Sequence, residues 1–118
     1  VLSKEFSKDM KKSKWGRIVN IGSSSAYNGF KNSTAYCSSK HALLGFSRAL
    51  FSELKDSNVR VYSISPGSTQ TKMGKLSKDQ KFETFLEPNE VADYVAFVIE
   101  FDKQLINEEI RLNRMQIE

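Results

Sequence analysis

Residues 16–50 read GRIVNIGSSSAYNGFKNSTAYCSSKHALLGFSRAL and contain the pattern of a strand, a loop and a helix. It opens with the continuous apolar run typical of a strand buried on both faces, namely Ile18, Val19 and Ile21. The Ser-, Gly- and Asn-rich residues 23–34 that follow predict a loop. From about residue 35 to residue 55, apolar side chains recur at helical spacing, which predicts a helix. Its buried face is predicted to consist of Leu43, Phe46, Leu50 and Leu54.

The residues before this stretch also predict a helix, because Leu2, Phe6 and Met10 recur four residues apart. The helix should end near Trp15-Gly16, since glycine commonly lies just past a helix end. All of the net charge of +4 lies in residues 1–17, which hold six cations and two acids. A basic cluster can bind nucleic acid, but cations also complement the dipole at a helix end, and no ladder of aromatic side chains accompanies these. We therefore favour a solvated helix end over a nucleic-acid site.

The residues after residue 50 continue an alternation of strands and helices. Residues 58–65 are β-branched and aromatic and stop at Pro66-Gly67, which predicts a second strand. A short helix is predicted in the polar segment 68–87, and Pro88 suits the first turn of a helix that ends near Phe101. Alternating residues 109–115 predict a last strand. The order predicts an α/β fold with a parallel sheet and helices on its faces. The buried stripe of the Pro88 helix is predicted to be Val91, Tyr94, Val95, Val98 and Ile99.

The composition excludes several classes of protein. With 118 residues, of which 39% are hydrophobic and 27% charged, the chain is long enough for at most one domain and is not expected to be disordered. No run approaches the roughly 18 apolar residues of a membrane-spanning helix, and no signal-peptide core is present near the start. The single cysteine, Cys37, and the single histidine, His41, supply neither a disulfide nor the usual zinc ligands. We expect a cytoplasmic protein without a membrane segment or a metal site.

Three polar side chains are candidate catalytic residues. Tyr36 and Lys40 are four residues apart, so both lie on one face near the start of the predicted helix. An ammonium beside a phenol favours the phenolate, which makes the tyrosine a usable proton donor and acceptor. Ser23 directly follows the first strand, at the carboxyl end where open α/β sheets bind ligands.

These residues, in this order, identify a family resemblance. Residues 16–50, followed by NVRVYSISPGSTQTKM at 58–73, closely resemble the short-chain dehydrogenase/reductases, which are NAD(P)-dependent enzymes with a Rossmann-like fold. The resemblance implies a doubly wound parallel sheet. It covers only the C-terminal, catalytic half of that fold, with about three strands and their flanking helices. Residues 1–118 would therefore be a single partial domain.

The resemblance also implies a role for individual residues in hydride transfer between a nicotinamide and a carbonyl or secondary alcohol. Tyr36 would be the catalytic acid/base, and Lys40 would hold the nicotinamide ribose. Ser23 would donate a hydrogen bond to the substrate oxygen, with Ser25 as a further substrate contact; Ser23 has the family's separation from the tyrosine. NAD or NADP would be contacted by Ile21, Tyr36, Lys40, Pro66, Gly67, Thr69 and Thr71.

The sequence departs from the family pattern in one respect. No three of its six glycines fit the GxGxxG spacing of a dinucleotide-binding loop. We therefore expect a fragment that lacks the N-terminal half, is inactive alone, and is poorly soluble because the first strand has an uncovered edge. At full length the resemblance implies a homodimer or homotetramer acting on a small carbonyl or alcohol substrate. The alternatives are an inactive subunit-assembly module and, least favoured, a nucleic-acid binder.

Overall fold

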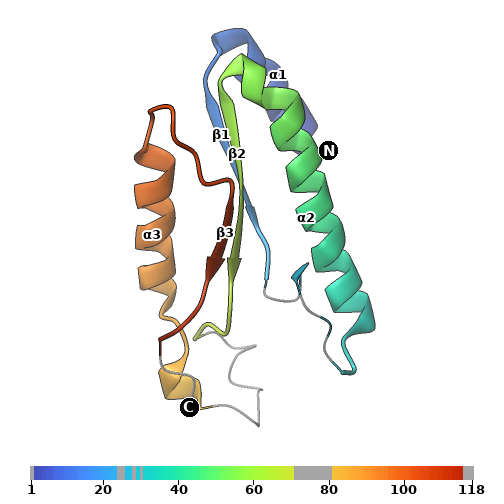
Figure 1. Cartoon of the computed structure of the whole chain (residues 1–118), viewed down its shortest axis with the longest axis vertical. Helices are drawn as coiled ribbons and strands as arrows, with labels where there is room; N and C mark the ends of the chain where they lie inside the picture. The colour runs from blue at the N-terminus through green and yellow to red at the C-terminus, as the bar shows by residue number, and fades with distance from the viewer. Residues whose placement is uncertain (1, 24–25, 28, 30, 71–80, 116–118) are drawn as a thin grey trace.

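The structure, a computed structural model, describes residues 2–23, 26–27, 29, 31–70 and 81–115 of the chain. In these residues a three-stranded parallel sheet, with strand order β1-β2-β3, lies between helices (Figure 1). The helices are α1 (Leu2–Ser13), α2 (Thr34–Leu54) and α3 (Pro88–Glu100), with short 3₁₀ turns η2 (Lys55–Ser57) and η4 (Phe82–Thr84). The strands are β1 (Gly16–Ile21), β2 (Val59–Pro66) and β3 (Glu109–Leu112). This confirms the predicted α/β fold with three parallel strands.

The helices cover both faces of the sheet because parallel neighbours need a crossover connection (Figure 1). One core cluster joins α2 to the sheet and consists of Ile18, Leu50, Leu54, Val59 and Val61, with Met10 and Phe51 packed against it. The other lies on the α3 side and centres on Tyr62, Ile64 and Ile110, with Val19, Val95, Val98 and Ile99 packed against it. Alternate residues of β2 thus point to opposite faces, and the sheet is doubly wound.

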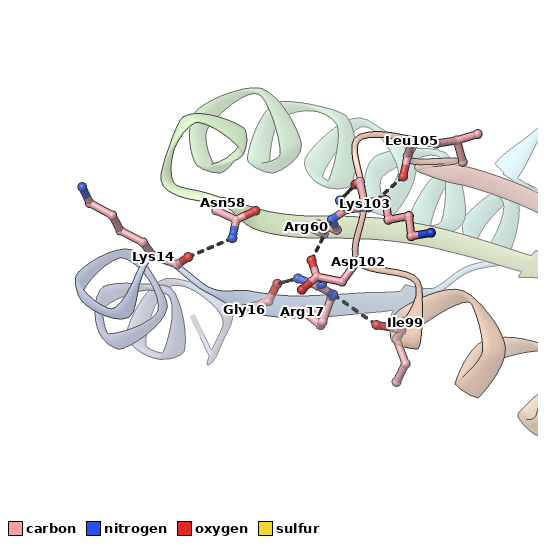
Figure 2. A network of polar contacts seen from close by, with 9 residues as sticks. All are labelled: Lys14, Gly16, Arg17, Asn58, Arg60, Ile99, Asp102, Lys103 and Leu105. Carbon is pink, nitrogen blue, oxygen red and sulfur yellow. Dashed lines mark hydrogen bonds and ion pairs between the residues drawn. The ribbon is translucent and has the colours of Figure 1, made fainter.

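The amino ends of β1 and β2 are held by two arginines (Figure 2). The Arg17 side chain is only 7% exposed; it donates to the carbonyl oxygens of Gly16 and Ile99 and pairs with Asp102 at 2.7 Å. Arg60 donates to the carbonyl oxygens of Lys103 and Leu105. These contacts fix the connection between α3 and β3 to the two neighbouring strands.

Two predicted buried faces are partly wrong. In α2 the buried face runs through Leu44, Ser47, Leu50 and Leu54, whereas Phe46 is 45% exposed. The polar residue Ser47 is 3% exposed and belongs to this face, so a prediction from apolar spacing alone misplaced it. In α3 the predicted member Tyr94 is 43% exposed. Leu2 and Phe6, whose spacing predicted α1, are exposed as well.

Several predicted ends also shift. α1 stops at Ser13, and the residue with positive φ is Lys14 (φ 53°) rather than a glycine. Gly16 is needed for space instead, because a Cβ there would lie 2.5 Å from the Met10 sulfur. β3 ends at Leu112 and not at residue 115. The helix predicted within residues 68–87 falls largely on residues 71–80, outside the described residues, and the described part contains only η4 and a bridge between Thr69 and Leu86.

Candidate active site

The carboxyl end of β1 leads directly into the predicted serine. The last residue of β1, Ile21, is paired with Ile64, and the next amide, Gly22 N–H, donates to the Ile64 carbonyl oxygen at 2.7 Å. A Cβ on Gly22 would lie 2.7 Å from Ser65 Oγ. Glycine therefore lets the chain leave β1 close against β2 before it reaches Ser23.

Ser23 is half-buried and begins a turn. Its carbonyl oxygen accepts a hydrogen bond from the Ala26 amide at 2.9 Å, and we call this hydrogen-bonded unit the Ser23 turn. Ala26 is buried, so the turn is anchored at its far end. Ser25, the other predicted substrate contact, lies outside the described residues.

Tyr36 and Lys40 lie in the first turns of α2, which starts at the end of the sheet where β1 and β2 finish (Figure 1). Tyr36 is 39% exposed, and the Lys40 Nζ lies 5.6 Å from the centre of its ring. The neighbouring Cys37 is buried, which shows that α2 turns one side to the protein and presents the Tyr36–Lys40 pair on another. A cation at this distance interacts favourably with the aromatic ring. The structure thus brings together the predicted pair.

The Pro66-Gly67 turn is held against β3. Pro66 pairs with Leu112, and the Gly67 amide donates to the Leu112 carbonyl oxygen at 2.9 Å. Thr69 Oγ1 donates to the Gly67 carbonyl oxygen at 3.0 Å, and Thr69 forms a bridge with Leu86. The predicted cofactor contacts Pro66, Gly67 and Thr69 therefore form one ordered turn, whereas Thr71 lies outside the described residues.

Ile21 corrects the prediction that β1 is buried on both faces throughout. Its side chain is 50% exposed, while Ile18 is buried. The exposed apolar side chain lies at the last position of β1, one residue before Gly22. The sheet therefore offers an uncovered apolar side chain at the carboxyl end of β1, two residues before Ser23.

A polar cluster beside this end was missed by the sequence analysis. Glu109 Oε1 accepts from Arg48 Nε and Nη2 at 3.1 and 2.7 Å, and from the Tyr27 hydroxyl at 3.4 Å. Burial, followed by the charge of Glu109, raises the pKa of Tyr27 above its usual value, and the same carboxylate raises the pKa of Arg48. Arg48 and Glu109 are 61 residues apart, so only the folded topology reveals the cluster.

Two further observations bear on the site's chemistry. The described residues contain no group of three or more His, Cys, Asp or Glu side chains placed to hold a metal ion. Among the same residues, no helix has both the length and the apolar character needed to cross a membrane.

Comparisons with known proteins agree with this arrangement. The chain is 36% identical over 114 residues to the 3-oxoacyl-[acyl-carrier-protein] reductase FabG of Aquifex aeolicus, covering 88% of the chain and 46% of that protein. It superposes on a 4-hydroxyisoleucine dehydrogenase complexed with NADH with a TM-score of 0.79 and 32% identity, covering 95% of the chain and 51% of that one. It superposes on ElxO with NADP bound with a TM-score of 0.80 and 26% identity, covering 93% of the chain and 50% of that one.

The chain thus spans about half the length of these relatives. The family model described as short chain dehydrogenase matches residues 1–81. That match covers more than half of the chain and includes β1, which Ser23 follows, α2, which carries Tyr36 and Lys40, and β2. The chain belongs to the short chain dehydrogenase family.

Proposed function

We propose that this chain carries the catalytic half of an NAD(P)-dependent oxidoreductase that interconverts a carbonyl and a secondary alcohol. The observation that carries the proposal is the Tyr36–Lys40 pair on one face of α2, at the end of the sheet where Ser23 follows β1. A hydroxyl donor, a phenol and an ammonium at the carboxyl end of parallel strands suit proton transfer to a bound carbonyl oxygen.

Each side chain has a separate role in this proposal. Ser23 and Tyr36 donate hydrogen bonds to the substrate oxygen and so stabilise the negative charge that develops there. The Tyr36 hydroxyl gives its proton to that oxygen during reduction and takes it back during oxidation. Lys40 keeps a positive charge 5.6 Å from the centre of the Tyr36 ring and holds the cofactor ribose.

The residues at the carboxyl ends of the strands fit NAD or NADP, the cofactors named for two of the solved relatives. Ile21 supplies an exposed apolar surface for the nicotinamide ring, and the Pro66-Gly67 turn with Thr69 supplies backbone and hydroxyl groups for the polar part. When bound, the cofactor supplies the hydride.

A 3-oxoacyl thioester is the first substrate to test, because the A. aeolicus relative is named as a 3-oxoacyl-[acyl-carrier-protein] reductase. The assay uses a chimaera in which this chain replaces the matched portion of that reductase. Oxidation of NADPH should depend on the substrate. Ser23→Ala should lower kcat by about 10²–10³-fold, because one donor to the developing oxyanion is removed.

Ser39→Ala is the matched control, because Ser39 is an exposed serine in α2. It should leave kcat unchanged. A folded chimaera that binds NADPH but does not turn over, or one that is indifferent to Ser23→Ala, contradicts the proposal. A thermal melt of the 118-residue chain with and without NADPH measures separately whether the chain binds cofactor, since a ligand of the native state raises its Tm.

Exposed apolar side chains favour assembly as a second candidate function. Leu2 and Phe6 of α1 are 73% and 61% exposed, and Phe46 lies exposed on α2. Single exposed apolar residues are ordinary, but several on two helices suit contact with another subunit. Tyr36→Phe separates the two functions, because it should abolish turnover and leave the association state, measured by analytical ultracentrifugation, unchanged.

A further inference from the structure

Tyr27 joins the loop after β1 to the far strand of the sheet. It is the residue after Ala26, whose amide closes the Ser23 turn. Its hydroxyl donates to Glu109 Oε1, at the first position of β3 and 82 residues away along the chain. Since β2 lies between β1 and β3, this hydrogen bond links the loop that follows one edge strand to the other edge strand.

Three further contacts hold Tyr27 and its acceptor Glu109 in this position. The Arg111 guanidinium carbon lies 4.4 Å from the centre of the Tyr27 ring, on the same strand as Glu109. Arg48 of α2 fixes the acceptor, because its two donors bind the same Glu109 oxygen. Tyr27, Arg48, Glu109 and Arg111 therefore form one unit, which we call the Tyr27 clamp. It draws on the loop, on α2 and on β3.

The surroundings of Tyr27 favour its protonated phenol, which can donate a hydrogen bond. Burial is the main cause that raises the pKa of Tyr27, and the Glu109 carboxylate adds to it. A protonated phenol can donate to Glu109, whereas a phenolate would be repelled by it. The Glu109 side chain is 30% exposed and the Arg48 side chain 58% exposed, so only the carboxylate side of this ion pair is partly shielded from water.

We propose that the Tyr27 clamp positions the Ser23 turn, so that Tyr27, Arg48 and Glu109 act on the reaction through the Ser23 hydroxyl. The proposal rests on the proposed function for its effect on turnover. The structural reason is that the Ala26 amide donates to the Ser23 carbonyl oxygen, and Ala26 is followed directly by Tyr27, whose hydroxyl is held by Glu109. The clamp residues are positioning residues and do not touch the substrate.

The first test measures amide hydrogen exchange by NMR in the full chain. Glu109→Gln removes the charge and keeps an acceptor of the same shape, and Tyr27→Phe removes only the hydroxyl. Glu109→Gln should speed exchange of the Ala26 amide by about tenfold, because the hydrogen bonds to the carboxylate are charge-assisted. Tyr27→Phe should give a smaller increase. Exchange of the Gly22 amide, which bonds to Ile64 within the sheet, should not change.

Glu108→Gln is the matched control, because it makes the same change of charge one residue before β3. It should leave both amides unchanged. Unchanged Ala26 exchange in both clamp variants, with a protected Gly22 amide, overturns the proposal. If Glu109→Gln unfolds the sheet, both amides lose protection, and the milder Tyr27→Phe decides the question.

The second test is a double-mutant cycle in the chimaera. Glu109→Gln should lower kcat and leave the KM for NADPH unchanged, because Ser23 acts on the substrate oxygen and not on the cofactor. In a Ser23→Ala background Glu109→Gln should have no further effect, since the clamp acts only through Ser23. An equal loss in both backgrounds shows a general structural role and overturns the proposal. A chimaera without turnover counts against the proposed function, and the exchange measurement still decides the clamp.

Discussion

The two ends of the β1–β2 pair differ in how their polar groups are used. At the amino end the guanidinium groups of Arg17 and Arg60 are nearly buried, and their donors bind backbone carbonyl oxygens and Asp102 (Figure 2). At the carboxyl end Tyr36 is 39% exposed and Ile21 is 50% exposed. The buried Nδ2 of Asn20 has no hydrogen-bond partner among the described residues.

This difference separates the residues that stabilise the fold from those that are accessible for chemistry. At the amino end, the donors of Arg17 and Arg60 are used to hold the α3–β3 connection. At the carboxyl end, helix α2 and the Pro66-Gly67 turn surround the strand ends and leave reactive groups accessible. Substitutions at the two ends should therefore separate stability from activity.

The largest expected effect is on activity alone. Tyr36→Phe in the chimaera should lower kcat by about 10²–10⁴-fold, the usual contribution of a general acid or base. Its Tm should stay close to that of the parent, because the hydroxyl that is removed belongs to a part-exposed side chain. Steady-state kinetics and a thermal melt of the same preparation provide the comparison. A large loss of Tm would show that the carboxyl end also carries stability.

The second prediction concerns the core near the amino end. Leu54 is 2% exposed and packs in one cluster with Ile18, Val59 and Val61. Leu54→Ala should lower the free energy of unfolding by about 2–5 kcal/mol, because it leaves a cavity. Denaturant titration of the full chain measures the change. Phe46→Ala is the control on the same helix and should cost much less, since Phe46 is 45% exposed. Equal losses in the free energy of unfolding would show that Phe46 is buried, as apolar spacing predicted.

A third prediction addresses the arginine network itself. Arg17→Leu should lower the free energy of unfolding by about 1–3 kcal/mol, because the Ile99 and Gly16 carbonyl oxygens lose their buried donor. Arg17→Lys should recover only part of the loss, since an ammonium lacks the planar fork that reaches several acceptors. Denaturant titration ranks the variants. If Arg17→Lys retained full stability, the positive charge rather than the planar shape of the guanidinium would stabilise the amino end of the sheet.

The sequence predicted those parts of the molecule that depend on local pattern. Local signals predicted each α-helix and strand of the described residues to within a few positions. These signals are the apolar runs, Pro88, and the end of a strand at Pro66-Gly67. The Tyr36–Lys40 spacing placed both side chains on one helix face, because four residues make about one turn. Local rules suffice where the interacting residues are neighbours in the chain.

Long-range partners could not be predicted in the same way. Arg17 and Asp102 are 85 residues apart, and Tyr27 and Glu109 are 82 apart. No pattern in the sequence marks which acid each of these side chains meets, since pairing depends on strand order and register. The buried face of α2 was misplaced for another reason, because it includes the polar residue Ser47, which apolar spacing does not mark.

The smallest expected effect is a pH dependence at the amino end. The hydrogen bond from Arg17, above all, holds the pKa of Asp102 below its usual value of 3.8. A carboxyl whose pKa is lowered by folding stabilises the native state when ionised, so its contribution is fully present above the usual pKa and is lost as the pH falls through the folded-state value. Asp102→Asn should therefore lower Tm slightly near neutral pH, and the difference from the parent should shrink below about pH 4. Asp93→Asn, an exposed acid of α3, is the control. A difference independent of pH would show that Asp102 acts through its shape and hydrogen bonding rather than its charge.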